Sequence, residues 1–311
     1  MLARVAQNLY WMGRYMERAE FQTRYAVVQY FSTLEAPMLD HADFTLRSIL
    51  YMSGTDYDSK VELSDTEVIR KVIFDASDPT SVVSMVNNVR ENARGIRNNI
   101  STELWESINK WNLYCKDYNR QTFSISKFYA FFEQMRGHVA MVKSDMVHTL
   151  LHRDVWHFLN IGVYLERAFQ VMKIIRSKIS DYTILSNDGE NRVLLLYQYH
   201  ILLKCLEAFD IHQVLTRGKL MNSTGIFELV IGNMDFPRSV NASLNKYSYH
   251  LKAISEQPTG HDQLCDALDL SLKGFWEFNQ FDSEDMIIQH LEDVNQRVLK
   301  LHTQMDELFF Q

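Results

Sequence analysis

Apolar residues recur at helical spacing in two segments of the chain that resemble each other. Within residues 2–19 the apolar positions are three or four residues apart, which is the spacing of one face of an α-helix. Residues 10–19 return, altered, as residues 159–168, with Gly, Tyr, Glu, Arg and Ala in the same register. The pattern predicts two related long helices, at about 2–33 and about 153–181, each carrying a Glu-Arg pair.

The opposite face of each predicted helix carries large polar side chains rather than the Lys, Glu and Gln typical of a solvated face. The first stripe is Arg4, Asn8, Trp11, Tyr15, Arg18 and Gln22, and its counterpart is Arg153, His157, Asn160, Tyr164, Arg167 and Val171. Such side chains combine bulk with directional hydrogen-bonding groups. The stripes therefore suit a buried polar seam or the wall of a ligand site.

A glycine precedes each Glu-Arg pair by one helical turn, Gly13 before Glu17 and Gly162 before Glu166. Glycine inside a helix costs about 0.5–1 kcal/mol relative to alanine. Its presence at matched positions predicts that another backbone or a ligand approaches closely there. We favour a tight helix–helix crossing.

The rest of the chain also predicts helices, because only 4 prolines and 11 glycines interrupt 311 residues. We therefore expect an all-α fold, a multi-helix bundle that contains the two long Glu-Arg helices. We find no linker that separates independent domains, and we expect one domain over residues 1–311 with a subdivision near 182–190.

Several shorter helices can be placed by their end signals. We expect one at about 40–52, and one that runs to Phe74 from a capping box opened by Ser64. Asp78 is the expected N-cap of the next helix, with Pro79 at its first position. Residues 227–231 are apolar enough for a strand, but a short helix fits this context better.

Charge and cysteine content exclude several classes of function. The net charge of −7 and the lack of a basic tail argue against nucleic acid as a partner. Three widely separated cysteines indicate a reducing compartment rather than a disulfide framework. Neither a signal-peptide pattern nor an apolar run of membrane-spanning length is visible, so we expect a cytoplasmic protein without a membrane partner.

The candidate chemistry lies in arginine and glutamate. The sequence has no Gly-rich phosphate loop, Glu-x-x-His motif or nucleophile elbow, and no cofactor or metal is expected. The guanidinium group binds a carboxylate or phosphate through two parallel hydrogen bonds, which lysine cannot do. The candidate ligand-binding residues are Arg4, Asn8, Trp11, Arg14, Glu17, Arg18, Arg90, Glu91, Asn92, Arg94, Arg153, Glu166, Arg167 and Arg238.

This arginine–glutamate set has two interpretations. On the three helices with embedded Arg and Glu the arginines outnumber the glutamates by five to three, which suggests a pocket for a carboxylate or phosphate. The alternative is a salt-bridge network that satisfies itself and fixes helix register. Removing one partner of such a buried pair costs about 3–5 kcal/mol.

Four motifs in order resemble the bacterial Alpha-E family: residues 4–20, 78–94, 156–168 and 235–240. The chain departs from the family pattern at Val163, often arginine, and at Phe169, usually acidic. The resemblance implies an all-helical partner of a circularly permuted ATP-grasp protein, often encoded beside it or fused to it, and frequently near a transglutaminase-like peptidase. ATP-grasp ligases activate a carboxylate as an acyl phosphate and form an amide. A role in making or modifying a small peptide is thus implied.

Three functions follow from these observations. The first is an accessory protein for an ATP-grasp amide ligase, with an Arg–Glu centre that binds a small carboxylate, peptide or phosphate ligand. The second is an enzyme of peptide or amide transfer with Glu17 or Glu166 as general base. Neighbouring arginines favour the ionised glutamate, which makes it a poor base near neutral pH. The third is a purely structural scaffold.

Overall fold

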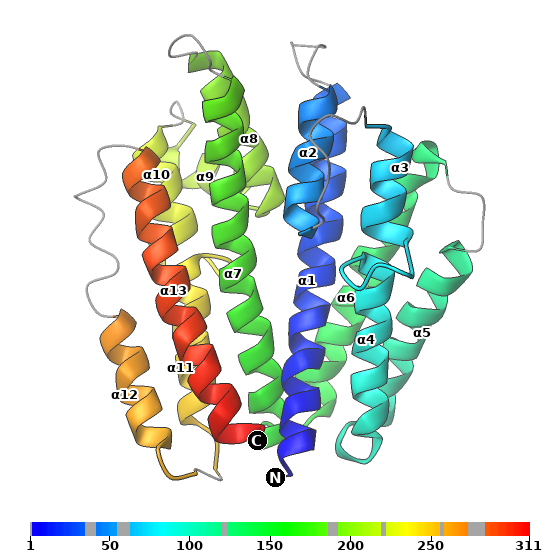
Figure 1. Cartoon of the computed structure of the whole chain (residues 1–311), viewed down its shortest axis with the longest axis vertical. Helices are drawn as coiled ribbons and strands as arrows, with labels where there is room; N and C mark the ends of the chain where they lie inside the picture. The colour runs from blue at the N-terminus through cyan, green and yellow to red at the C-terminus, as the bar shows by residue number, and fades with distance from the viewer. Residues whose placement is uncertain are drawn as a thin grey trace. The chain divides into compact units, whose positions relative to one another are not determined.

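The computed structural model of the chain describes residues 2–34, 42–54, 63–119, 124–185, 192–218, 222–255, 258–272 and 284–311. Every regular element in these ranges is helical, which confirms the all-α prediction (Figure 1). The chain forms two compact units, one of residues 8–163 and one that joins Met1–Gln7 to 164–311. The expected single domain stays a prediction, and most of the subdivision expected near 182–190 lies outside the described residues.

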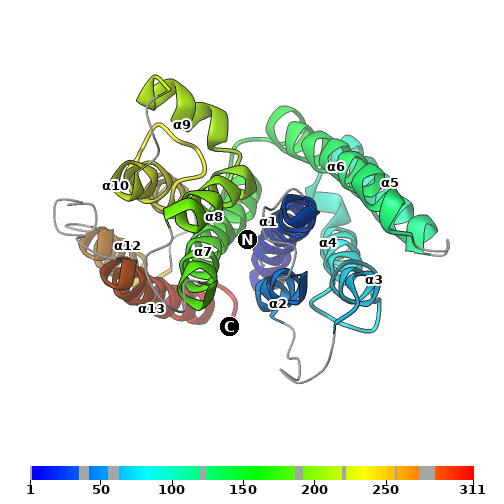
Figure 2. The same ribbon diagram turned by 90° about the horizontal axis from the view of Figure 1, so that it is seen from above.

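The unit of residues 8–163 is built on the long helix α1 and the first part of α7. Its elements are α1 (Ala3–Leu34), α2 (Ala42–Ser53), α3 (Asp65–Ile69) with a π-helical turn (Arg70–Phe74), α4 (Val82–Gly95), a 3-10 turn (Arg97–Asn99), α5 (Thr102–Asn119), a 3-10 turn (Ile125–Lys127), α6 (Phe128–Thr149) and α7 (Asp154–Leu185). Helix α5 packs against α4 and α6, and Figures 1 and 2 both show α5 beside α6. The core of this unit includes the fully buried Phe21, Tyr25, Trp111 and Phe131.

The two long helices confirm the expectation from their glycines. A Cβ atom added to Gly13 of α1 would lie 2.3 Å from the carbonyl oxygen of Leu159 on α7. A Cβ atom added to Gly162 would lie 2.1 Å from the carbonyl oxygen of Tyr10. The helices therefore cross backbone to backbone, as the favoured interpretation predicted.

Two predicted helix starts are wrong in detail. Ser64 precedes α3 but its side chain makes no capping hydrogen bond, so no capping box forms. Helix α4 begins at Val82 with Ser81 as N-cap, and the Ser81 hydroxyl accepts the Ser84 N–H at 3.3 Å. The carboxylate of Asp78 instead accepts the Thr80 N–H at 2.8 Å. Because a side chain that bonds the backbone two residues ahead forms a turn, residues 78–80 are not yet helical and the helix begins further along the chain.

The other unit contains the rest of α7 and the C-terminal helices. These are α8 (Arg192–Cys205), α9 (Phe209–Thr216), α10 (Ser223–Phe227) with a π-helical turn (Glu228–Gly232), α11 (Val240–Lys252), α12 (His261–Leu272) and α13 (Glu284–Phe309). Helix α12 packs against α11 and α13. Residues 227–231 are helical, as predicted. Among the described residues no helix has the length and apolar character needed to cross a bilayer.

Candidate functional site

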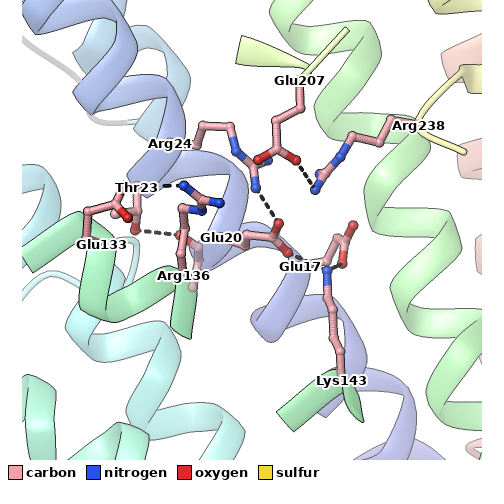
Figure 3. A network of polar contacts seen from close by, with 10 residues as sticks. Glu17, Glu20, Thr23, Arg24, Glu133, Arg136, Lys143, Glu207 and Arg238 are labelled. Atoms are coloured by element: carbon pink, nitrogen blue, oxygen red, sulfur yellow. Dashed lines mark hydrogen bonds and ion pairs between the residues drawn. The ribbon is translucent and has the colours of Figure 1, made fainter. Parts of the chain in front are cut away.

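Glu17, the glutamate of the first Glu-Arg pair, belongs to a buried ionic cluster. Glu17 of α1 is 0 % exposed, and the ammonium group of Lys143 on α6 lies 2.9 Å from its Oε2 atom (Figure 3). The same ammonium also binds Oε2 of Glu20, one turn further along α1. Arg24 donates from Nη2 to the other oxygen of Glu20 at 2.5 Å. We call Glu17, Glu20, Arg24 and Lys143 the Glu17 cluster.

Burial and solvent access differ within the Glu17 cluster. Glu20 and Arg24 are buried on α1, and Lys143 is the most exposed member at 28 %. Moving a charge out of water costs several kcal/mol unless partners replace the water. The alternation of carboxylate and cation supplies such partners, and solvent reaches the cluster at Lys143.

Arg14, on the same helix, is buried against aromatic rings. It donates from Nη1 to the Tyr10 hydroxyl at 2.9 Å, and its guanidinium carbon lies 5.2 Å from the centre of the Trp11 ring. A guanidinium over an aromatic face gains cation–π stabilisation. Arg18 is half-buried, and Asn8 packs against Gly95 at the end of α4.

The arginines and glutamate of α4 form a separate network near the surface. Glu91 pairs with Arg90 at 2.6 Å and with Arg94 at 2.5 Å. Arg90 also donates from Nε to Asn109 of α5 at 2.8 Å, and Asn92 donates to the Asn88 carbonyl of its own helix. None of these bonds reaches the Glu17 cluster. In the described part of the chain, these side chains of α4 thus form a network of their own.

The second Glu-Arg pair belongs to the other unit. Glu166 is buried and accepts a hydrogen bond from Gln170 at 2.7 Å. Arg167 lies over the Tyr164 ring at 5.0 Å and donates to the Pro237 carbonyl at 3.3 Å. The second copy therefore contacts the segment at Pro237, which the sequence had marked as a separate motif.

Arg238 follows Pro237 and pairs with Glu207 at 2.6 Å (Figure 3). Glu207 has a φ of 54°, a left-handed conformation that is uncommon for residues other than glycine. Such conformations cost about 1–3 kcal/mol and occur often at functional sites. In this unit the structure brings Arg167 close to the residue that precedes Arg238. The predicted residues Arg4 and Arg153 are exposed.

Sequence analysis missed Glu20, Arg24, Lys143 and Glu207. Glu20 and Arg24 could have been found, because they stand four residues apart on α1 and can pair there. Lys143 lies next to the apolar face of α6, but nothing in its own segment indicates which carboxylate it meets. Glu207 shows no sequence signal, because its conformation is imposed by the fold.

The described residues offer little for nucleophilic or metal chemistry. Burial raises the pKa of the Cys265 thiol to about 11, and it raises the pKa of Cys115 well above its usual range. Thiols of high pKa are poor nucleophiles. The described residues contain no group of three or more metal-ligating side chains. The charged side chains of the Glu17 cluster can bind groups of opposite charge.

A family model named Alpha-E, described as a predicted alpha-helical domain with a conserved ER motif, matches residues 1–310. The dipeptide Glu-Arg occurs in the chain at 17–18 and at 166–167 and nowhere else. Comparisons with curated proteins and with solved structures found no match.

Proposed function

The chain belongs to the Alpha-E family, and on this premise we propose that it is a helical accessory protein of an ATP-grasp amide ligase. In this proposal it binds a small ligand at its buried arginine–glutamate centre. The ligand carries a carboxylate or phosphate, as an amino acid or a small peptide would. A transglutaminase-like peptidase acting on the same peptide is a further proposed partner, and the cytoplasm is the proposed compartment.

One observation supports this proposal more than the others: the Glu17 cluster places two carboxylates and two cations in the interior of a helical unit. Solvent reaches this cluster at Lys143. A ligand with both a carboxylate and an amine can exchange with internal ion pairs without leaving a buried charge uncompensated. Its carboxylate would bind Arg24 or Lys143, and its amine would bind Glu17 or Glu20.

The proposed ligand matches the chemistry of an amide ligase. Such an enzyme joins a carboxylate to an amine, so its substrates and products carry these two groups. A protein that binds them can deliver a substrate, retain a product or sense the supply of either. The proposal therefore needs no catalytic group in this chain.

A structural role for the same cluster is the main rival, because its charges pair with one another without any ligand. In that case the ion pairs fix the register of α1 against α6, and function lies elsewhere. The structural role and the binding role predict different effects of a ligand. Only if the cluster binds a ligand will adding that ligand raise the free energy of unfolding.

Thermal unfolding against amino acids, dipeptides and inorganic phosphate tests the binding role. A ligand at 100 times its dissociation constant stabilises the fold by about 2.7 kcal/mol. We expect such a shift for the wild type and its loss in Lys143→Met. Lys110→Met is the matched control, because Lys110 is 72 % exposed and lies 3.9 Å from its partner Glu106.

The partnership is tested separately, with a circularly permuted ATP-grasp ligase from the same organism. We expect the two proteins to copurify and the ligase to turn over ATP faster when the accessory protein is present. If no compound shifts the melting temperature, the binding role fails. If the ligase neither binds this chain nor depends on it, the accessory role fails.

A further inference from the structure

Arginine and tryptophan gather in a surface patch on α4, α5 and the turn between them. We call Arg90, Arg94, Arg97 and Trp105 the Arg–Trp patch. Its polar contacts run within these segments and do not reach the Glu17 cluster. The ligand site proposed above therefore leaves the patch without a role.

The patch is held in a fixed geometry. The guanidinium carbons of Arg90 and Arg97 lie 5.6 Å and 5.7 Å from the centre of the Trp105 ring. Arg90 is also fixed by Asn109 at 2.8 Å, and Arg97 donates to the Ile100 carbonyl at 3.3 Å. A surface ordered before binding loses less conformational entropy when a partner arrives.

The patch is positively charged on a chain whose net charge is −7. Glu91 is the carboxylate that pairs with these arginines, with Arg90 at 2.6 Å and with Arg94 at 2.5 Å. Arg90 and Arg94 thus share one carboxylate, whereas Arg97 donates to the Ile100 carbonyl and the Thr102 hydroxyl, which are neutral. Arg94 is 65 % exposed, and its Nε and Nη1 atoms make no hydrogen bond with a described residue. These donors are available to an external acceptor.

We propose that the Arg–Trp patch is a docking surface for an acidic segment of a partner protein. Carboxylates of the segment bind Arg94 and Arg97, whose forked donors match carboxylate geometry. An apolar side chain of the segment covers the exposed part of Trp105. Arginine and tryptophan are the residue types that most often dominate protein interfaces.

The charge of the whole chain favours a protein over a nucleic acid as the occupant. A nucleic acid is a dense polyanion, and a chain of net charge −7 repels it at long range. An acidic protein segment carries only a few negative charges, so it needs charge complementarity with the Arg–Trp patch alone and not with the whole chain. The patch itself does not depend on the proposed function, but the choice of the ATP-grasp ligase as the partner rests on it.

Two probes test the patch: a circularly permuted ATP-grasp ligase from the same organism, and a fluorescent ten-residue peptide of Glu and Asp with one central Leu. Binding is measured for the wild type, Arg94→Glu and Trp105→Ala. We expect each variant to weaken binding at least tenfold. The matched control is Arg136→Glu, because Arg136 is 53 % exposed and pairs with Glu133 three residues earlier, as Arg94 pairs with Glu91.

The outcomes separate this proposal from the accessory role. If the ligase binds all variants equally, the patch proposal fails and the partnership stands. If only the peptide binds, and Arg94→Glu weakens it while Arg136→Glu does not, the patch stands and the ligase is the wrong partner. If neither probe depends on Arg94, or if a DNA duplex competes for the patch more strongly than the peptide, the proposal is overturned.

Discussion

Gly13 of α1 and Gly162 of α7 make reciprocal contacts across the crossing of their helices. A Cβ atom on Gly13 would meet the Leu159 carbonyl oxygen at 2.3 Å, and one on Gly162 would meet the Tyr10 carbonyl oxygen at 2.1 Å. Tyr10 and Leu159 are separated by the same 149 residues as the two glycines. The sequence repeat therefore coincides with a local two-fold relation between the helices, and backbone approaches backbone on both sides of it.

Replacing either glycine by alanine should destabilise the protein. Elsewhere in a helix this change gains about 0.5–1 kcal/mol. At Gly13 or Gly162 the new methyl group overlaps a carbonyl oxygen that cannot move without its helix, and overpacking of this kind costs about 1–3 kcal/mol or more. Urea unfolding at equilibrium measures the change in the free energy of unfolding.

Gly137→Ala is the control for this pair. Gly137 also lies inside a helix, α6, but nothing lies within 4 Å of its added Cβ atom. The substitution should therefore raise the free energy of unfolding by about 0.5–1 kcal/mol. Equal effects at all three glycines would show that the crossing is looser than the structure indicates.

A second prediction compares two serines that precede helices. Ser239 is buried at the start of α11, accepts the Ala242 N–H at 3.0 Å and donates to the Asn233 carbonyl at 2.5 Å. Ser64 precedes α3 without a capping bond from its side chain. We expect Ser239→Ala to cost about 1 kcal/mol or more and Ser64→Ala to be near neutral. Similar losses in thermal unfolding would contradict this assignment.

The long helices could be predicted from sequence because burial imposes their spacing along many turns. The observed α1 (Ala3–Leu34) and α7 (Asp154–Leu185) begin within one residue of the expected positions. The predicted start of a helix was less accurate where two nearby polar side chains could each act as the N-cap, as at Asp78 and Ser81. Both can bond the backbone, and the choice depends on a turn geometry that the sequence does not display.

The sequence predicted those features of the site that depend on the spacing of residues within a single helix. The matched glycines indicated close approach at Gly13, and its reciprocal partner Gly162 confirmed it. The partner of Glu17 was not foreseen, because Lys143 comes from a helix far away in sequence. For the same reason Arg90 was grouped with Glu17, although it contacts α5. A periodic stripe shows that residues share a face, but it does not show which element covers that face.

A third prediction concerns pH. Burial lowers the pKa of His212 below its ordinary value of about 6.5. Its Nε2 atom is buried without a hydrogen-bond partner in the described structure. The folded state therefore favours the neutral ring, and the unfolded state binds the proton more readily. The contribution of His212 is complete above about pH 6.5 and is lost as the pH falls toward the folded-state pKa.

The comparison of His212→Phe with the wild type tests whether His212 makes the protein less stable as the pH falls. The wild-type melting temperature should fall between pH 7.5 and pH 5.5, and the variant should lose less over the same range. His148→Asn serves as the control, because His148 is exposed and its removal should leave the slope unchanged. A steeper fall in His212→Phe than in the wild type would contradict the assignment.

A double-mutant cycle on Glu17 and Lys143 separates the two roles of the Glu17 cluster. Lys143→Met removes the ammonium group from two buried carboxylates and should cost about 3 kcal/mol, because one partner of a buried pair is left. Adding Glu17→Gln removes the carboxylate as well, so the double variant should be more stable than the sum of the single losses predicts, by about 0.5–3 kcal/mol. The exposed pair of Lys110 and Glu106 should show almost no coupling in the same experiment.

The same variants then decide between packing and binding. If the cluster only fixes the register of α1 against α6, the double variant should recover stability, and no amino acid, peptide or phosphate should shift the melting temperature of any form. If the cluster is a ligand site, the double variant should recover stability but not the ligand-dependent shift of the wild type. The double variant lacks one cation and one carboxylate of the cluster while the fold remains, so this loss cannot be attributed to unfolding.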